Sequence, residues 1–239
     1  MKERFPEVSS KILEGFESEV REVSDQLAEL YGTPHLGNFS DPTAEFLYIV
    51  LSRKTPEDAY IEAFRSLLEL RSWDKLLHME TGEIENLIYG GGLEGKKAKA
   101  IEGGLNRIVK EYGVLEDWGD EDDPEELFKF LTSLPEIGPK SARCIMLYSF
   151  GFPVFPVDAH TGRILSRLGI CKSLGIDLSE MGHKGWQRAL ADIIPRDERY
   201  RLHVNLVEHG RALCTARSTD CAKCPLKGSC ELGQSQQVD

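Results

Sequence analysis

Four of the six cysteines stand within 17 residues, and this cluster constrains the chain more than any other feature. The segment reads CTARSTDCAKCPLKGSC, so Cys214, Cys221, Cys224 and Cys230 follow the spacing C-x6-C-x2-C-x5-C. Four thiolates in so short a loop can wrap around a compact cluster of metal and sulfide. A structural zinc more usually takes two C-x2-C pairs separated by a longer spacer. We therefore favour a metal centre over disulfides for residues 214–230.

The other two cysteines and the general composition predict an ordinary globular protein. Cys144 and Cys171 stand alone, which is typical of small buried hydrophobic residues. The 239 residues suffice for one large domain or two small ones. No apolar run approaches the roughly 18 residues of a membrane span, and the segment MKERFPEVSSKILEG lacks the apolar core of a signal peptide. We expect a cytoplasmic protein.

The net charge of −11 argues at first against a nucleic-acid partner, because such proteins usually carry a basic surface. The acid is concentrated, however. Residues 1–30 hold 8 acids and 4 bases, and residues 116–126 hold 8 acids and no base. The rest of the chain is close to neutral and can still present a local basic face. The acidic run itself is expected to be a solvated loop.

The dominant hydrophobic period is helical and strand-like alternation is nearly absent, so we predict an all-α fold. The segments Thr55-Pro56-Glu57-Asp58 and Asp123-Pro124-Glu125-Glu126 have the residues of helix N-termini. Behind the first, Ile61, Phe64, Leu67 and Leu68 are expected to form one apolar face. Further helices are expected at residues 44–51, 96–112, 141–150, 161–168, 185–193 and 198–213.

Two connections between these helices stand out. Residues 90–95 are a glycine-rich turn before a basic helix, and residues 150–156 are an extended, proline-containing link. The glycine-rich turn alone does not indicate more than flexibility.

A third connection, Leu134 to Gly138, forms a tight turn before a helix beginning near Lys140. Such a turn can direct backbone N–H groups and the positive end of the helix at one phosphate. A plain link between two helices is the alternative, and the turn alone does not decide between them.

Lys140 and Asp158 are candidate reactive residues. In the first helical turn the dipole disfavours an added positive charge and is expected to lower the lysine pKa, which makes the amine a better nucleophile. Asp158 lies 18 residues after Lys140, follows the extended link and can cap the next helix. A solvated lysine and a capping aspartate are the simpler interpretations.

Taken together, the turn, Lys140, Asp158 and the cysteine spacing resemble the helix-hairpin-helix DNA glycosylases of the endonuclease III type, over roughly residues 41–232. The resemblance implies a DNA glycosylase with AP lyase activity that acts as a monomer on double-stranded DNA containing a damaged or mismatched base, at the nucleoid. It implies a [4Fe-4S] cluster on Cys214, Cys221, Cys224 and Cys230. Lys140 would be the Schiff-base nucleophile, with Asp158 as its partner.

The resemblance also implies an architecture and DNA contacts. Residues 41–154 would form a helical-barrel domain with the hairpin, and residues 1–40 plus 155–239 a second helical domain with the cysteine loop. Lys140 and Asp158 would face each other across a DNA groove between these two lobes. Leu93 would wedge into the base stack. The other expected DNA contacts are Gly138, Ser141, His160, Lys96 and Lys97 in the body of the chain, and Arg217, Lys223 or Lys227 in the cysteine loop.

Three departures from the family pattern put the substrate in doubt. The family hairpin commonly reads Leu-Pro-Gly-x-Gly-Arg-Lys, whereas this chain has Glu136 at the first glycine and Pro139 at the arginine. Glu136 is expected to bring a carboxylate near the phosphate. Where the family often has a glutamine that fills the gap left by the flipped base, this chain reads Arg53-Lys54-Thr55. A monofunctional uracil or thymine mismatch glycosylase, or a non-catalytic DNA-binding module, are the alternatives.

Overall fold

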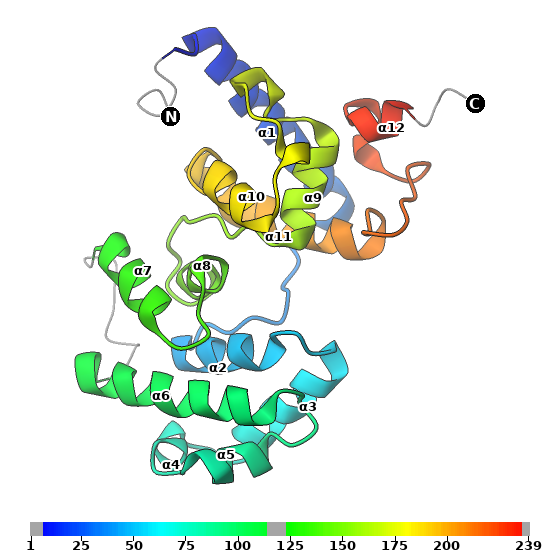
Figure 1. Cartoon of the computed structure of the whole chain (residues 1–239). Coiled ribbons are helices and arrows are strands. Elements are labelled where there is room, and N and C mark those ends of the chain that lie inside the picture. Colours follow the sequence, from blue (N-terminus) through cyan, green and yellow to red (C-terminus); the bar gives the residue numbers. More distant parts are fainter. Residues whose placement is uncertain (1–6, 114–122, 236–239) are drawn as a thin grey trace. The chain divides into compact units, whose positions relative to one another are not determined.

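The computed structural model describes residues 7–113 and 123–235, and within these ranges every regular element is a helix. The strand-like pairing in the described residues is an isolated antiparallel β-bridge between Cys214 and Thr219. The predicted all-α class is confirmed. The chain divides into two compact units, which are considered separately: unit 1 comprises residues 1–36 and 153–239, and unit 2 comprises residues 37–152 (Figure 1).

Unit 2 is organised around a long helix, α6, which packs against α2, α4 and α5. Close packing is possible because α6 carries Gly104: a Cβ at this position would lie 2.3 Å from the ring of Phe46 in α2. Phe46 is fully buried as a result. The helices are α2 (Pro42–Ser52), α3 (Glu57–Leu68), α4 (Trp73–Leu77), α5 (Thr81–Leu87), α6 (Glu94–Tyr112), α7 (Pro124–Ser133) and α8 (Pro139–Tyr148).

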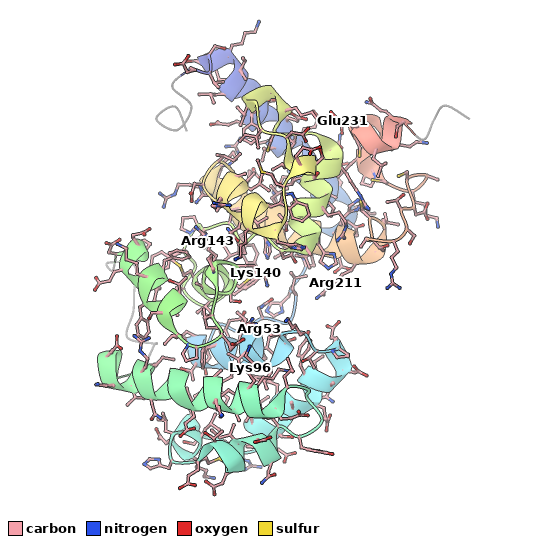
Figure 2. All side chains as sticks on the ribbon, in the orientation of Figure 1. Arg53, Lys96, Lys140, Arg143, Arg211 and Glu231 are labelled. Carbon is pink, nitrogen blue, oxygen red and sulfur yellow. The ribbon has the colours of Figure 1, made fainter. Side chains whose placement is uncertain are left out.

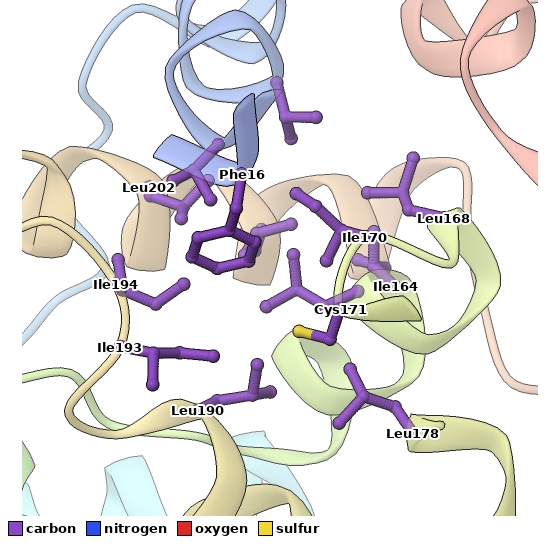
Figure 3. Packing of buried hydrophobic residues seen from close by; sticks show 14 of the residues in the cluster. Phe16, Ile164, Leu168, Ile170, Cys171, Leu178, Leu190, Ile193, Ile194 and Leu202 are labelled. Atoms are coloured by element: carbon purple, nitrogen blue, oxygen red, sulfur yellow. The ribbon is translucent and has the colours of Figure 1, made fainter. Parts of the chain in front are cut away.

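Unit 1 brings the first helix of the chain together with the C-terminal ones, because α1 packs on α11 and α11 on α9. Phe16 of α1 is buried among aliphatic side chains from α9, α10 and α11 and the segments that join them (Figure 3). Buried Glu198 adds polar bonds to α1, since it accepts from the Ser24 hydroxyl at 2.7 Å. The α-helices are α1 (Ser10–Tyr31), α9 (Ala159–Leu168), α10 (His183–Leu190), α11 (Arg199–Ala212) and α12 (Glu231–Ser235).

One of the two predicted helix starts is confirmed and the other is wrong in its cap. The Asp123 side chain accepts from the Glu125 N–H at 2.9 Å and caps α7 as expected. Helix α3 instead begins at Glu57 after Pro56, without a side-chain cap. The Thr55 hydroxyl donates to the Arg53 carbonyl and accepts from Lys97, so it is not available to the helix. Leu68 was expected on the apolar face of α3 but is 44% exposed.

The remaining predicted helices correspond to α2, α6, α8, α9, α10 and α11, within a few residues at each end. Helix α1 was missed, although Phe16, Val20, Val23 and Leu27 recur at helical spacing and are buried. Most of the acidic run lies outside the described residues, which resume at residue 123. Among the described residues, no helix is long and apolar enough to cross a membrane.

Candidate active site and metal centre

Helices α7 and α8 are joined by the predicted tight turn, the hairpin of residues 134–138. The turn is closed by a hydrogen bond from the Ile137 N–H to the Leu134 carbonyl at 3.2 Å. Gly138 is extended and caps α8, whose first turn contains Lys140 and half-buried Ser141. Pro139 supplies no N–H, so the other residues of this turn must provide the backbone donors directed out of the helix N-terminus.

Lys140 is exposed at the second position of α8, and Arg143 lies one turn further along the same helix (Figure 2). A buried carboxylate of unit 2, Glu45 in α2, interacts electrostatically with Lys140. Glu45 accepts hydrogen bonds from the Asn38 amide at 2.6 Å and from the Phe39 N–H at 2.9 Å. Burial raises the pKa of Glu45 to about 7, although both hydrogen bonds and Lys140 oppose the change. Glu45 was not predicted from the sequence, where its only signal is an acid inside the apolar stretch of α2.

Glu136 takes the left-handed backbone conformation, with φ +64°, that a glycine would adopt without strain. Its carboxylate forms ion pairs with Arg53 at 2.5 Å and with Lys96 at 3.0 Å. Arg53 also donates to the Glu136 carbonyl. The hydrogen bond from Lys96, and then the charges of Arg53 and Lys96, hold the pKa of Glu136 below its usual value. Two of the departures from the family pattern are therefore bonded to each other, and the carboxylate is neutralised locally.

The glycine-rich turn presents two large exposed side chains. Leu93 is 50% exposed and adopts a left-handed conformation, φ +58°, at the N-cap of α6. Tyr89, at the start of the same turn, is 85% exposed and was not singled out from sequence. Between them, Gly90 and Gly92 both donate backbone hydrogen bonds to the Glu94 carboxylate, at 3.1 and 3.0 Å. The turn is thus bonded internally and holds Leu93 at the surface.

Lys97 does not lie where a DNA contact requires it. The residue is only 3% exposed, and its ammonium donates to the Leu51 carbonyl, the Thr55 hydroxyl and the Gly91 carbonyl at 2.5, 2.5 and 2.7 Å. All three ammonium donors are therefore matched inside the protein. The expectation that Lys97 binds phosphate is corrected on this ground, whereas Lys96 is exposed beside Glu136.

Asp158 caps α9, because its carboxylate accepts from the Thr161 N–H at 2.8 Å. The capping interpretation is thus correct. Asp158 belongs to unit 1, whereas Lys140 belongs to unit 2.

His160, in the first turn of α9, is half-buried against α11. A Cβ added to Gly210 would lie 2.4 Å from its Nδ1, so only glycine leaves room for the ring. Arg163 donates to Nδ1 at 3.1 Å. Because arginine can only donate, Nδ1 must accept and the remaining proton of the neutral ring lies on Nε2. Nε2 is the atom with which His160 could donate to a ligand.

The four clustered cysteines line one hollow in unit 1, together with side chains of α9 and α11. They are all half-buried and unbridged. Burial, and then the nearby Cys214, Cys230 and Cys221, raise the pKa of the Cys224 thiol to about 11. Thiols that disfavour one another's ionisation are stabilised as thiolates by a cationic metal centre.

Polar side chains that sequence analysis missed hold this loop. Arg167 donates to the Cys214 sulfur at 3.1 Å and to the Thr215 carbonyl at 2.8 Å. The His209 ring lies 3.5 Å from the Cys224 sulfur through Nε2 and 3.0 Å from the Tyr31 hydroxyl through Nδ1. Hydrogen bonds to ligand sulfurs are the usual second layer of an iron–sulfur site.

The four clustered cysteines are a donor set that could together hold a metal group. Among the described residues, no three His, Cys, Asp or Glu side chains meet closely enough to ligate a single metal ion. All four sulfurs nevertheless surround the same hollow, and its other walls are mostly apolar, including Ile164, Leu168 and Leu226. Cys144 and Cys171 are buried elsewhere, as expected, and burial raises the pKa of Cys171 to about 12.

Comparison with known proteins gives sequence relatives but no matching family model. The chain is 31% identical over 161 residues to endonuclease III of Synechocystis sp., which covers 67% of each protein. It is 29% identical over 194 residues to endonuclease III of Thermotoga maritima, covering 81% of this chain and 84% of that one. It is also 30% identical over 182 residues to the DNA glycosylase/AP lyase ROS1 of Arabidopsis thaliana, of whose length it spans 13%.

Solved structures share the fold. A trapped endonuclease III–DNA covalent intermediate matches with a TM-score of 0.75 and 25% identity, covering 92% of this chain and 98% of that one. A non-covalent endonuclease III–DNA complex also has a TM-score of 0.75, at 26% identity and with coverage of 93% and 99%. A thermostable thymine-DNA glycosylase matches in fold at a TM-score of 0.71 and 17% identity, over 91% of this chain and 98% of that one.

Proposed function

Because this chain belongs to the endonuclease III family, whose helix-hairpin-helix fold it has, we propose that it is a DNA glycosylase with AP lyase activity. It would excise a damaged or mismatched base from duplex DNA and then cut the strand. The observation that carries the proposal is the exposed Lys140 in the first turn of α8, directly after the hairpin. A trapped covalent protein–DNA intermediate is known for a relative with this fold.

Binding would depend on a few contacts. The hairpin at Gly138 and Ser141 would hold a phosphate through backbone donors, with Lys96 adding a charge. Leu93 would enter the base stack while the target nucleotide turns out, a step that costs least for a damaged or mismatched base. His160 would contribute through Nε2. We propose that unit 2 is the lobe with the hairpin and unit 1 the lobe with the cysteine loop.

The reaction we propose begins with the neutral amine of Lys140. Its nitrogen bonds to C1′ of the sugar while the bond to the base breaks, and the base leaves with that electron pair. The C1′–O4′ bond then opens while the nitrogen passes a proton to O4′, which gives a protonated imine between Lys140 and C1′. The imine makes the C2′ proton acidic, and loss of this proton forms a C2′–C3′ double bond and expels the 3′ phosphate. The Asp158 carboxylate would stabilise positive charge on the sugar or take the proton of the lysine.

Cys214, Cys221, Cys224 and Cys230 would hold a [4Fe-4S] cluster. When bound, the cluster supplies a rigid cross-link between the C-terminal end of α11 and the segment before α12. Arg167 and His209 would then orient ligand sulfurs rather than free thiols. The enzyme would act as a monomer, in the cytoplasm at the nucleoid.

Borohydride trapping on a panel of duplexes, each with one lesion or mismatch, tests the proposed chemistry. Wild type is expected to form a reduced covalent adduct through Lys140, and Lys140→Gln to lose both the adduct and strand cleavage. Asp158→Asn should bind damaged DNA at least as well, because the protein loses one negative charge, but excise the base by roughly 100- to 10,000-fold more slowly.

Two results would change the proposal. If Lys140→Gln excises the base normally and only the nick disappears, the enzyme is a monofunctional glycosylase in which water attacks C1′. If both variants match wild type in excision and cleavage, Lys140 and Asp158 are structural residues. A wild-type protein that binds DNA but excises no base from the whole panel would support the remaining alternative, a non-catalytic DNA-binding module.

A further inference from the structure

Three segments of unit 2 each contain a non-glycine residue in the left-handed conformation. These are Lys54, after α2, with φ +51°, Leu93, before α6, with φ +58°, and Glu136, in the hairpin, with φ +64°. The described residues hold one other such residue, Arg71. Such conformations persist only where the surroundings enforce them, and they gather at functional sites. The structure should therefore contain the interactions that enforce these three.

Adjacent lysines at the start of α6 supply these interactions. Lys96 reaches the hairpin through Glu136, which also binds Arg53 of the segment after α2 (Figure 2). Lys97 reaches the same segment through the Leu51 carbonyl and the Thr55 hydroxyl. The three segments are thus bonded to one another through side chains of residues 53, 96, 97 and 136.

Lys97 also bonds the turn that carries Leu93. Its third hydrogen bond goes to the Gly91 carbonyl, between Gly90 and Gly92, which both have positive φ. Glycines have the most conformational freedom to lose, so a turn with three of them needs external bonds to keep one conformation. Lys97 supplies such a bond from α6, and the Glu94 carboxylate accepts two more from the backbone N–H groups of Gly90 and Gly92.

The chemistry of this lysine indicates positioning rather than ligand binding. A buried ammonium must have its donors satisfied, and the three acceptors here are two carbonyls and a hydroxyl, not a carboxylate. Moving the ammonium to a phosphate would leave those acceptors unpaired. A group that is enclosed and fully hydrogen bonded instead fixes the backbone around it.

We propose that Lys97 is a positioning residue, which holds residues 90–93 in the conformation that exposes Leu93 and does not itself touch DNA. The proposal rests on the proposed function only in taking Leu93 as the residue that meets the base stack. Under this proposal, residues 90–93 have the conformation that recognises a distorted duplex before DNA binds. That conformation depends on the buried ammonium of Lys97.

The test compares Lys97→Met with Lys99→Met, which removes the same charge from an exposed position of the same helix. The probes are a duplex with one reduced abasic-site analogue and the undamaged duplex of the same sequence. We expect Lys97→Met to lose between roughly 10- and 100-fold of the preference for the analogue, because a displaced loop misplaces Leu93. Amide hydrogen exchange at residues 90–93 should accelerate in Lys97→Met only.

Two further measurements separate positioning from direct contact. The slope of log affinity against log salt should change no more in Lys97→Met than in Lys99→Met, whereas loss of a phosphate contact lowers it by about 0.9. Combined with Leu93→Ala, Lys97→Met should reduce the preference little further, because both act through one side chain. A lowered slope, an additive loss or unchanged exchange at residues 90–93 would overturn the proposal.

Thr55→Val provides a second variant should Lys97→Met fold poorly. It removes one acceptor of the ammonium with little change in shape, and should give the same changes in exchange and preference on a smaller scale. Because these readouts use binding and exchange alone, they decide the role of Lys97 even if no lesion on the panel is excised. Absence of excision would count against the proposed function and not against the positioning role.

Discussion

The cysteine loop of unit 1 and the three bonded segments of unit 2 are both irregular backbone, but they are held differently. The cysteine loop places four like side chains within a span of 17 residues, around one hollow. In unit 2 the bonded residues run from Leu51 to Glu136, and hydrogen bonds and ion pairs between different kinds of group join them. The cysteine loop would be held by the proposed cluster, whereas bonds between protein groups hold the segments of unit 2.

This difference determines what each region tolerates. Removing one of four ligands disables the whole metal site, because each ligand depends on the group shared with the others. Removing one member of a charge network loosens a single link and leaves the remaining links in place. The effects of substitution should therefore fall steeply from the first region to the second.

The largest effect is expected for Cys214→Ser. Anaerobically purified wild type should be brown with about four irons per chain, as in a cubane cluster. The variant should lose the iron and roughly 4–5 kcal/mol or more of stability, because loss of a metal is among the few changes with effects this large. Iron analysis and thermal unfolding measure both.

Cys144→Ser is the matched control, since Cys144 is buried in α8 of unit 2 and should leave the iron content unchanged. A colourless wild type with stoichiometric zinc would contradict the iron assignment. It would also bring the two regions closer, because a single ion would then organise the cysteine loop.

An intermediate effect is expected at Glu45, the buried carboxylate of unit 2. The unfolded chain loses this proton near pH 4.5, and the folded chain near pH 7. Between these values the folded state binds more protons, so this group lowers the free energy of unfolding as pH rises. As the pH rises from 4.5 to 8, the free energy of unfolding of Glu45→Gln should therefore increase by about 2–3 kcal/mol relative to that of wild type. One pKa unit corresponds to about 1.36 kcal/mol.

Denaturant unfolding at several pH values measures this gain. Glu62→Gln, at an exposed glutamate of α3, should show the pH dependence of wild type. If Glu45→Gln also shows the pH dependence of wild type, the carboxylate of Glu45 is hydrated in solution and is not the buried group described for unit 2.

The smallest effect is expected for the ion pair between Arg53 and Glu136. A double-mutant cycle with Arg53→Gln and Glu136→Gln should give a coupling of about 0.5–1 kcal/mol, because both side chains are partly exposed to solvent. The coupling should shrink in high salt. A coupling near zero would mean that this ion pair does not help to join the hairpin to the segment after α2, and one above about 2 kcal/mol would mean that it is as important as a buried pair.

The parts of the molecule that sequence predicted are those with local signals. Asp123 and Pro124 identify the start of α7, and the four cysteines identify their own loop by spacing. The hairpin was recognised because its residues are consecutive. In each case neighbours in the chain are also neighbours in space.

The features that sequence did not predict depend on distant partners. Thr55 is of a residue type that often caps helices, but its hydroxyl is bonded instead to the Arg53 carbonyl and the Lys97 ammonium. Lys97 has the residue type of a phosphate ligand, but three acceptors from two other segments enclose it. Arg167 and His209 reach the cysteine sulfurs from separate helices, and no short pattern indicates this.

The left-handed backbone at Leu93 has a consequence for the engineering of this protein. Holding leucine with φ +58° costs about 1–2 kcal/mol that glycine would not incur. A laboratory selection for heat resistance alone would therefore favour Leu93→Gly, which relieves the backbone while removing the side chain that we propose meets DNA. If Leu93 has the proposed role, the selected variants would be more stable but would recognise lesions poorly, so a screen should measure base excision as well as melting temperature.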